Sequence, residues 1–189
     1  MAVHPPRQYT VEEFEAFVWL PENADLRFEL IDGEMIEVPS NPYSSELAST
    51  FNRHVGNFVY ANKLGHVTSE AAGYIVNGQR LAPDMAFVSK TRQKQLAREG
   101  YNPIPPDLAV EVVSPTDRDE TLEKKLKHYA AAGVLVWVAY PKRREIDVHA
   151  PNAPRKTLGM DDILDGGTVL PGFTIAVKDI FADPLEDEE

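Results

Sequence analysis

The chain has no cysteine, so neither disulfide bonds nor thiolate metal sites can form. This fits a reducing compartment, and we expect a cytoplasmic protein. No apolar run approaches the roughly 20 residues that a helix needs to cross a bilayer. Residues 1–7 contain no basic segment followed by an apolar one, so we expect neither a secretory signal nor a membrane anchor.

Several common catalytic signatures are also missing. There is no phosphate-cradling glycine loop, no dinucleotide fingerprint and no serine set between glycines as a nucleophile. The 5 histidines are scattered, and no two of them lie one helical turn apart as zinc ligands would. The sequence therefore argues against a nucleotide-loop enzyme, a serine hydrolase and a zinc hydrolase.

Positive charge is scarce, with a formal net charge of −11. This weakens the case for nucleic-acid binding, because affinity for the phosphate backbone comes chiefly from Lys and Arg. Part of the acid lies in residues 183–189, which we expect to be a disordered tail. The basic residues are clustered, either on solvated faces or along a DNA groove: Lys90, Arg92, Lys94, Arg98, Lys124, Lys127, Lys142, Arg143 and Arg144.

The length of 189 residues and the hydrophobic content of 43% suit a single globular domain, which we place at residues 1–182. A capping box at Thr10 predicts a short helix, and the turn Asp32-Gly33 predicts a hairpin within residues 26–38. Apolar residues at three-to-four spacing predict a long amphipathic helix over residues 44–63.

The second half of the chain reads as strands around one further helix. Residues 66–76 read as a strand, joined by the turn Asn77-Gly78 to a strand bearing Asp84. We expect a short helix and an extended loop over residues 89–106. The apolar run 134–140 predicts a central strand, and the alternation in 145–149 predicts an edge strand.

Three charged residues stand where apolar ones would be expected. Asp84 heads a short apolar run, and Glu111 interrupts a run that reads as a doubly buried strand. A buried carboxylate is costly unless a cation or several donors meet it. In the helix predicted from residue 119, Lys125 falls beside the apolar stripe, whereas Lys124 points away from it.

Two acids and a lysine at the same end of a sheet form a candidate metal site. Carboxylate and carbonyl oxygens are the hard ligands that Mg²⁺ prefers, and a lysine can stabilise an anion. From the residues alone, a structural ion-pair network explains the pattern equally well.

Four motifs in this order are similar to a known family. They are Arg27-Phe28-Glu29-Leu30-Ile31-Asp32-Gly33-Glu34, then Pro83-Asp84, then Glu111-Val112-Val113-Ser114-Pro115, and then Lys125 followed by Tyr129, Gly133 and Val134. Over about residues 9–181 the chain resembles the Uma-type "putative restriction endonuclease" family, a bacterial branch of the PD-(D/E)XK nuclease superfamily. The resemblance implies an α/β (α+β) fold with a restriction-endonuclease-like core: a mixed central β-sheet flanked by helices, with an N-terminal helix and β-hairpin.

The resemblance also implies roles for single residues. Asp84 would be the acid of the Pro-Asp motif, and Glu111 the second metal ligand. The superfamily lysine would stand two residues after that glutamate, where this chain has Val113. Lys125 matches the lysine that this branch places on the following helix, and Glu29 matches a further glutamate, which we expect near the metal.

One feature of the family is absent from this chain. Members often carry a histidine just after the segment corresponding to Asn41 and Pro42, and here the sequence reads Tyr43-Ser44-Ser45. Any function of that histidine has no evident substitute in the sequence.

The activity implied is divalent-metal-dependent hydrolysis of DNA phosphodiester bonds. Mg²⁺ or Mn²⁺ would be held by Asp84, Glu111 and the carbonyl of Val112. Two other classes stay open: a catalytically idle nuclease-fold module for protein interaction or dimerisation, and a phosphohydrolase acting on small nucleotides. We expect DNA and a second copy of the chain as partners, and no membrane.

Overall fold

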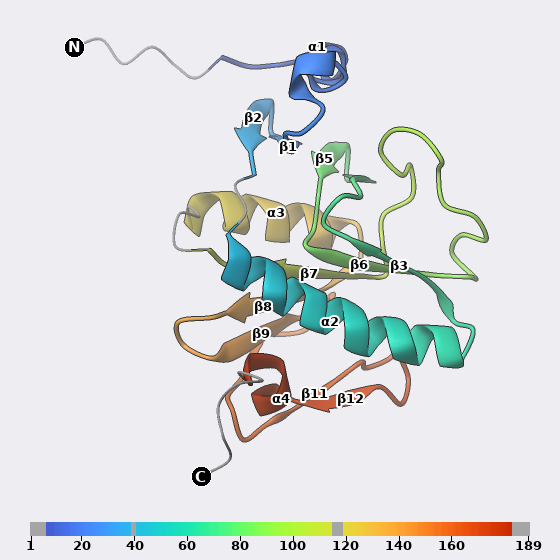
Figure 1. Ribbon diagram of the computed structural model, residues 1–189, viewed down its shortest axis with the longest axis vertical. Helices are drawn as coiled ribbons and strands as arrows, with labels where there is room; N and C mark the ends of the chain where they lie inside the picture. Colours follow the sequence, from blue (N-terminus) through green and yellow to red (C-terminus); the bar gives the residue numbers. More distant parts are fainter. Residues whose placement is uncertain (1–6, 39–40, 115–118, 183–189) are drawn as a thin grey trace.

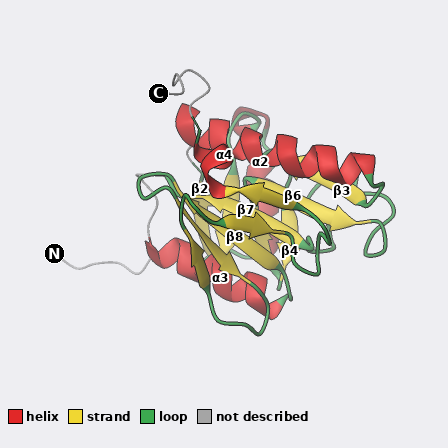
Figure 2. Cartoon of the chain, turned by 90° about the horizontal axis from the view of Figure 1, so that it is seen from below, coloured by secondary structure: helices red, strands yellow, loops and turns green. Residues whose placement is uncertain are grey.

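The structure is a computed structural model that describes residues 7–38, 41–114 and 119–182. The predicted acidic tail, residues 183–189, lies outside the described residues. Helices cover both faces of a central sheet, with α2 and α4 on one side and α3 on the other (Figure 2). This agrees with the expected α/β architecture.

The central sheet has six strands and is mixed. Only β7 and β8 run parallel, and the other neighbours are antiparallel. In sheet order the strands are β10 (Lys156–Leu158), β9 (Glu145–His149), β8 (Leu135–Tyr140), β7 (Leu108–Val112), β6 (Met85–Ser89) and β3 (Gly65–Ser69). The central position of β7 and β8 agrees with their apolar sequences, because such strands are buried on both faces.

One face of this sheet packs against α2 (Pro42–Ala61) and α4 (Val177–Phe181). The apolar stripe of α2 includes Phe51, which lies against Trp137 of β8 with ring centroids 6.3 Å apart. The two-stranded sheet of β11 (Ile163–Asp165) and β12 (Thr174–Ala176) joins the same core. Among the described residues, none of the helices combines the length and apolar character that a membrane crossing requires.

The other face carries α3 (Asp119–Ala131) and a separate four-stranded sheet. The strands of that sheet, in order, are β2 (Glu34–Glu37), β1 (Phe28–Ile31), β5 (Gln79–Leu81) and β4 (Tyr74–Val76). Helix α1 (Val11–Val18) packs outside β1, and a 3-10 turn, η1 (Pro21–Asn23), links them. Figure 1 shows α1, β1 and β2 stacked at one end of the molecule.

Two predicted strands are wrong in their extent. Residues 66–76 are not one strand, because Glu70 to Gly73 break the run and β3 and β4 join different sheets. Gly73 passes so close to the ring of Tyr101 that an added Cβ would lie 2.3 Å from it. Asp84 itself lies in the connection between β5 and β6, one residue before the strand predicted to bear it.

Two further predictions are corrected. Residues 89–106 contain no helix, because side chains organise this segment instead: the buried amide of Asn102 bonds to Gln93, to the Ala97 N–H and to the Ile104 carbonyl. Strand β9 is not an edge strand, because β10 pairs along its outer side.

Candidate active site

Glu111 is the next-to-last residue of the buried strand β7, and its side chain is on the α3 face. Alternation along the strand turns Val110 and Val112 toward α2 and leaves Glu111 facing α3. The residue is 7% exposed, and its carboxylate has two partners in α3. Lys125 Nζ lies 2.5 Å from Oε2, and the Tyr129 hydroxyl donates to Oε1 over 2.8 Å.

Lys125 is the inward lysine of α3, as its position in the helical pattern predicts. It is 6% exposed, and its ammonium contacts a second carboxylate, with Nζ 3.0 Å from Glu29 Oε1. The neighbouring Lys124 points away and pairs with Glu34 and Glu120 at the surface. A rotation of about 100° per residue separates the two ammonium groups, so only Lys125 enters the site.

Glu29 faces inward from the short strand β1 and is buried. In β1, Phe28 and Leu30 pack toward α1, whereas Glu29 and Ile31 face the central sheet. Glu29 is 2% exposed, and its Oε1 also accepts the Ala82 N–H over 2.7 Å. The four-stranded sheet therefore brings an acid into the space above β7.

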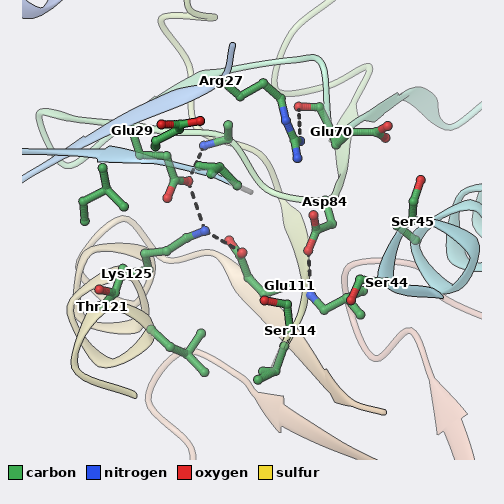
Figure 3. Close-up of a pocket in the computed structure, with 18 of the residues that line it drawn as sticks. Arg27, Glu29, Ser44, Ser45, Glu70, Asp84, Glu111, Ser114, Thr121 and Lys125 are labelled. Carbon is green, nitrogen blue, oxygen red and sulfur yellow. Dashed lines mark hydrogen bonds and ion pairs between the residues drawn. The ribbon is translucent and has the colours of Figure 1, made fainter. Parts of the chain in front are cut away.

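Asp84 reaches the same place from the β5–β6 connection. The pairing of β6 with β7 ends at Met85 and Val110, so the Val112 N–H lies beyond this ladder. The Asp84 carboxylate accepts that N–H, with Oδ2 2.7 Å from the nitrogen. Asp84 and Glu111 thus meet where two adjacent strands diverge, and Figure 3 shows both beside Lys125 and Glu29.

These four side chains line an open pocket of about 370 Å³. Ser44 and Ser45, at the start of α2, form part of the opposite wall (Figure 3). They occupy the stretch where the resemblance led us to look for a histidine. Of the residues that the structure describes, six carboxylates and two cations line the pocket: Glu29, Glu34, Glu37, Glu70, Asp84 and Glu111, with Arg27 and Lys125.

The electrostatics of the site follow from this excess of acid. Burial raises the pKa of Glu111 to about 8, the Lys125 charge opposes this, and the Glu29 and Asp84 charges add to it. Burial also raises the pKa of Asp84, although the Val112 N–H and Lys125 act against it. Three acidic side chains thus share one ammonium, and the raised pKa values of Glu111 and Asp84 reflect both burial and this shortage of positive charge.

The two donors to Glu111 keep their protons. Burial lowers the pKa of Lys125, but the Glu111 and Glu29 charges outweigh it, so the net direction is upward. Burial, together with the same carboxylates, raises the pKa of Tyr129 well above its usual value. Lys125 is therefore an ammonium and Tyr129 a neutral hydroxyl near neutral pH.

The donor chemistry of the site fits a small hard cation. Within the described ranges, no group of three or more Asp, Glu, His or Cys side chains is arranged to hold a metal ion. Mg²⁺, however, is commonly held by one or two carboxylates and completes its shell with water and substrate phosphate. Asp84 and Glu111 satisfy that smaller requirement, since a carboxylate that accepts hydrogen bonds retains lone pairs for a cation.

Tyr129 is the site residue that the sequence reasoning missed. It follows Leu122 and Leu126 at helical spacing, which is typical of a core position, and it is fully buried. The signal available in the sequence was its hydroxyl, because a buried tyrosine O–H needs a partner. Here the partner is Glu111. Tyr129 follows Lys125 by four residues, about one helical turn, so both side chains reach the same carboxylate.

Several basic residues proposed for a DNA groove have structural partners. Arg92 pairs with Asp107, with Nε 2.9 Å from Oδ1, and donates to the carbonyls of Pro105 and Pro106. Arg143 stacks on Tyr140 and pairs with Glu145. Arg92 therefore fastens the loop 89–106, while Lys90, Lys94 and Arg98 are exposed.

Comparisons with known proteins agree with this architecture. A crystal structure described as a putative nuclease belonging to DUF820, from Anabaena variabilis ATCC 29413, matches with a TM-score of 0.78. It is 20% identical, and the match covers 91% of this chain and 97% of that one, which shows the shared fold. A comparison with curated proteins gives no match. The model of the family described as "Putative restriction endonuclease" matches residues 11–178, and the chain therefore belongs to that family.

Proposed function

We propose that this protein is a divalent-metal-dependent nuclease that hydrolyses phosphodiester bonds in DNA. The observation that carries the proposal is the meeting of Asp84 and Glu111 at the point where β6 and β7 diverge, beside a buried ammonium and open to a pocket. Membership of the family supports the reaction class. The resemblance is the basis for expecting a homodimer, whereas the expectation of a cytoplasmic protein comes from the sequence composition, and both points stay predictions.

Asp84, Glu111 and the carbonyl of Val112 are the residues that would hold Mg²⁺ or Mn²⁺. When bound, such an ion polarises a phosphoryl oxygen and lowers the pKa of water. The chain's own contribution is to fix the two carboxylates, which it does through the Val112 N–H on one acid and Tyr129 on the other. A cation of charge two also offsets the excess of carboxylate around Lys125.

Lys125 acts as a permanent positive charge within the pocket. Its ammonium has three N–H donors, and two of them face Glu111 and Glu29. The third can hold a water molecule for attack on phosphorus or stabilise the charge that develops on the phosphate oxygens. Glu29 keeps the ammonium in place and can orient a second water.

The proposal is tested by cleavage assays on duplex, nicked and single-stranded DNA and on small nucleotides, with and without Mg²⁺. Asp84→Asn and Lys125→Ala should each abolish Mg²⁺-dependent cleavage, whereas Lys124→Ala should retain it. Cutting by both site variants would reject the assignment. Hydrolysis confined to the small nucleotides would move the function to a phosphohydrolase, a reading favoured by the acidic lining of the pocket.

A catalytically idle nuclease-fold module is the second candidate. It is favoured by the direct pairing of Lys125 with Glu111 and Glu29, which satisfies much of the site without an ion. Calorimetric titration with Mg²⁺ and Mn²⁺ separates the two candidates. An active site would show saturable binding that Glu111→Gln removes, and an idle module would show none.

A further inference from the structure

One cation among the described residues of the pocket wall has no ion-pair partner. Arg27 is half-buried, and the contact of its guanidinium is a hydrogen bond from Nη1 to the Glu70 carbonyl, 3.1 Å long. It stands two residues before Glu29, so the strand alternation that turns Glu29 toward the central sheet also turns Arg27 toward it. Figure 3 shows the guanidinium extending into the pocket toward Asp84.

The other cations in and around the site are already paired. Lys125 faces two carboxylates, and Lys124 beside the pocket pairs with Glu34 and Glu120. Arg80, in the neighbouring strand β5, pairs with Glu15 through two nitrogens. Among the described residues that line the pocket, Arg27 is therefore the cation without an ion pair.

The carbonyl of Glu70 fixes this arginine without neutralising it. A backbone acceptor uses one of the five N–H donors and leaves the others for a ligand. The guanidinium group is a rigid fork that matches two oxygens of a phosphate, and it stays charged at any physiological pH. A guanidinium group without an ion pair, in a pocket lined by acids, is suited to bind an anion whose charge is also offset by a bound metal cation.

We propose that Arg27 binds the phosphate group of the substrate, contacting its non-bridging oxygens beside Asp84 and Glu111. The inference rests on the proposed nuclease function and gives it a substrate contact. Arg27 is then the residue through which the acidic pocket recognises an anion, because Lys125 is held by its own carboxylates. Glu34, Glu37 and Glu70 also line the pocket, and their negative charge opposes further contacts with anions.

The test compares Arg27→Gln and Arg27→Lys with the wild type. Arg53→Gln, an exposed position on α2, is the matched control for the loss of one positive charge. Affinity for a fluorescein-labelled single-stranded oligonucleotide is measured by anisotropy in Ca²⁺ over a range of salt concentrations. Cleavage is measured separately in Mg²⁺, and unfolding temperatures check that each variant is folded.

We expect Arg27→Gln to weaken binding about 10- to 100-fold, as loss of a hydrogen bond to a charged group does. The slope of log affinity against log salt should fall by about 0.7, the value for one phosphate contact on a single strand. Arg27→Lys should restore the slope but only part of the affinity, because it keeps the charge and loses the fork. A purely structural arginine would not change the salt slope.

The outcomes separate the two proposals. If the wild type binds and Arg27→Gln has the same affinity and salt slope, Arg27 does not contact phosphate, whatever the cleavage assay shows. A second outcome is that the wild type binds the oligonucleotide in Ca²⁺, Arg27→Gln binds it more weakly, and the wild type cleaves nothing in Mg²⁺. That result would support the phosphate contact of Arg27 and reject the nuclease activity. If the wild type binds no oligonucleotide, the Arg27 proposal is overturned, and cleavage of duplex and nicked DNA in Mg²⁺ decides the nuclease proposal separately.

Discussion

Two buried carboxylates flank the same residue of the central sheet, and they differ in what surrounds them. Glu111 of β7 and Asp147 of β9 are both in register with Val138 of β8. They are 7% and 2% exposed, respectively, and alternation places them on the same face of the sheet. By burial alone, Asp147 has the stronger claim to be a functional acid.

The partners of Asp147 balance its charge. The Thr157 hydroxyl, across from it in β10, donates to Oδ1 over 2.5 Å, and Arg155 Nη1 lies 3.4 Å from Oδ2. Tyr140 also interacts with Asp147 through its hydroxyl, so this acid meets one cation and two hydroxyls. Glu111, in contrast, shares Lys125 with Glu29, lies near Asp84 and opens onto the pocket. A surplus of acid facing open space therefore marks the candidate site better than burial does.

The largest effect should follow from removing the shared cation. Lys125→Met leaves Glu111 and Glu29 buried without an ion partner, which typically costs about 3–5 kcal/mol of the free energy of unfolding. Urea denaturation measures this loss. Lys124→Met, the adjacent surface position on the same helix, should cost at most about 1 kcal/mol because its ion pairs are in water. Equal losses for the two variants would mean that Lys125 holds no buried charge.

The convergence of Asp84, Glu111 and Lys125 could be predicted because each carries a local signal. A charged residue in an apolar strand and a lysine beside a helical stripe are both visible in one dimension. The order of strand, helix and strand then places their ends together. The burial of Glu29 had no such signal, because β1 is only four residues long and its inner face depends on which sheet it joins.

The rest could not be predicted because it depends on pairing between distant residues. The sequence left Arg92 either on a solvated face or along a DNA groove, because nothing in the intervening loop indicates its contact with Asp107. Strand β9 was predicted to be an edge strand because its neighbour β10 has only three residues of mixed polarity, which do not indicate a strand in the sequence. The division of residues 66–76 between two sheets is likewise a property of the packing.

A smaller effect should separate the two carboxylates by function. Asp147→Asn keeps an acceptor for Thr157 but buries an amide in place of a charge, which should cost about 1–3 kcal/mol of stability. Calorimetric Mg²⁺ binding should be unchanged, because Asp147 does not line the pocket. Glu111→Gln, a change of the same size and charge, should lose that binding. If Asp147→Asn also abolished Mg²⁺ binding, the distinction between balanced and surplus acid would fail.

The smallest effect concerns pH and arises beside Asp147. Burial lowers the pKa of His149, the Asp147 charge raises it, and Arg155 again lowers it, with a net downward direction. In the described part of the chain its Nε2 atom is buried without a hydrogen-bond partner, so protonation inside the fold is unfavourable. Because the unfolded chain takes up this proton more readily, the histidine favours the folded state at neutral pH. That contribution is lost as the pH falls through about 6.5, the ordinary value for histidine, toward the lower folded value.

His149→Phe removes this titration while retaining a ring of similar size. Between pH 7 and pH 5, the free energy of unfolding of the variant should therefore decline less steeply than that of the wild type in urea titrations. The other acid-sensitive groups remain in both proteins, so the difference between the two curves isolates the histidine. Parallel curves would show that His149 takes up its proton equally well in both states, and the surroundings of Asp147 would then be wetter than its burial indicates.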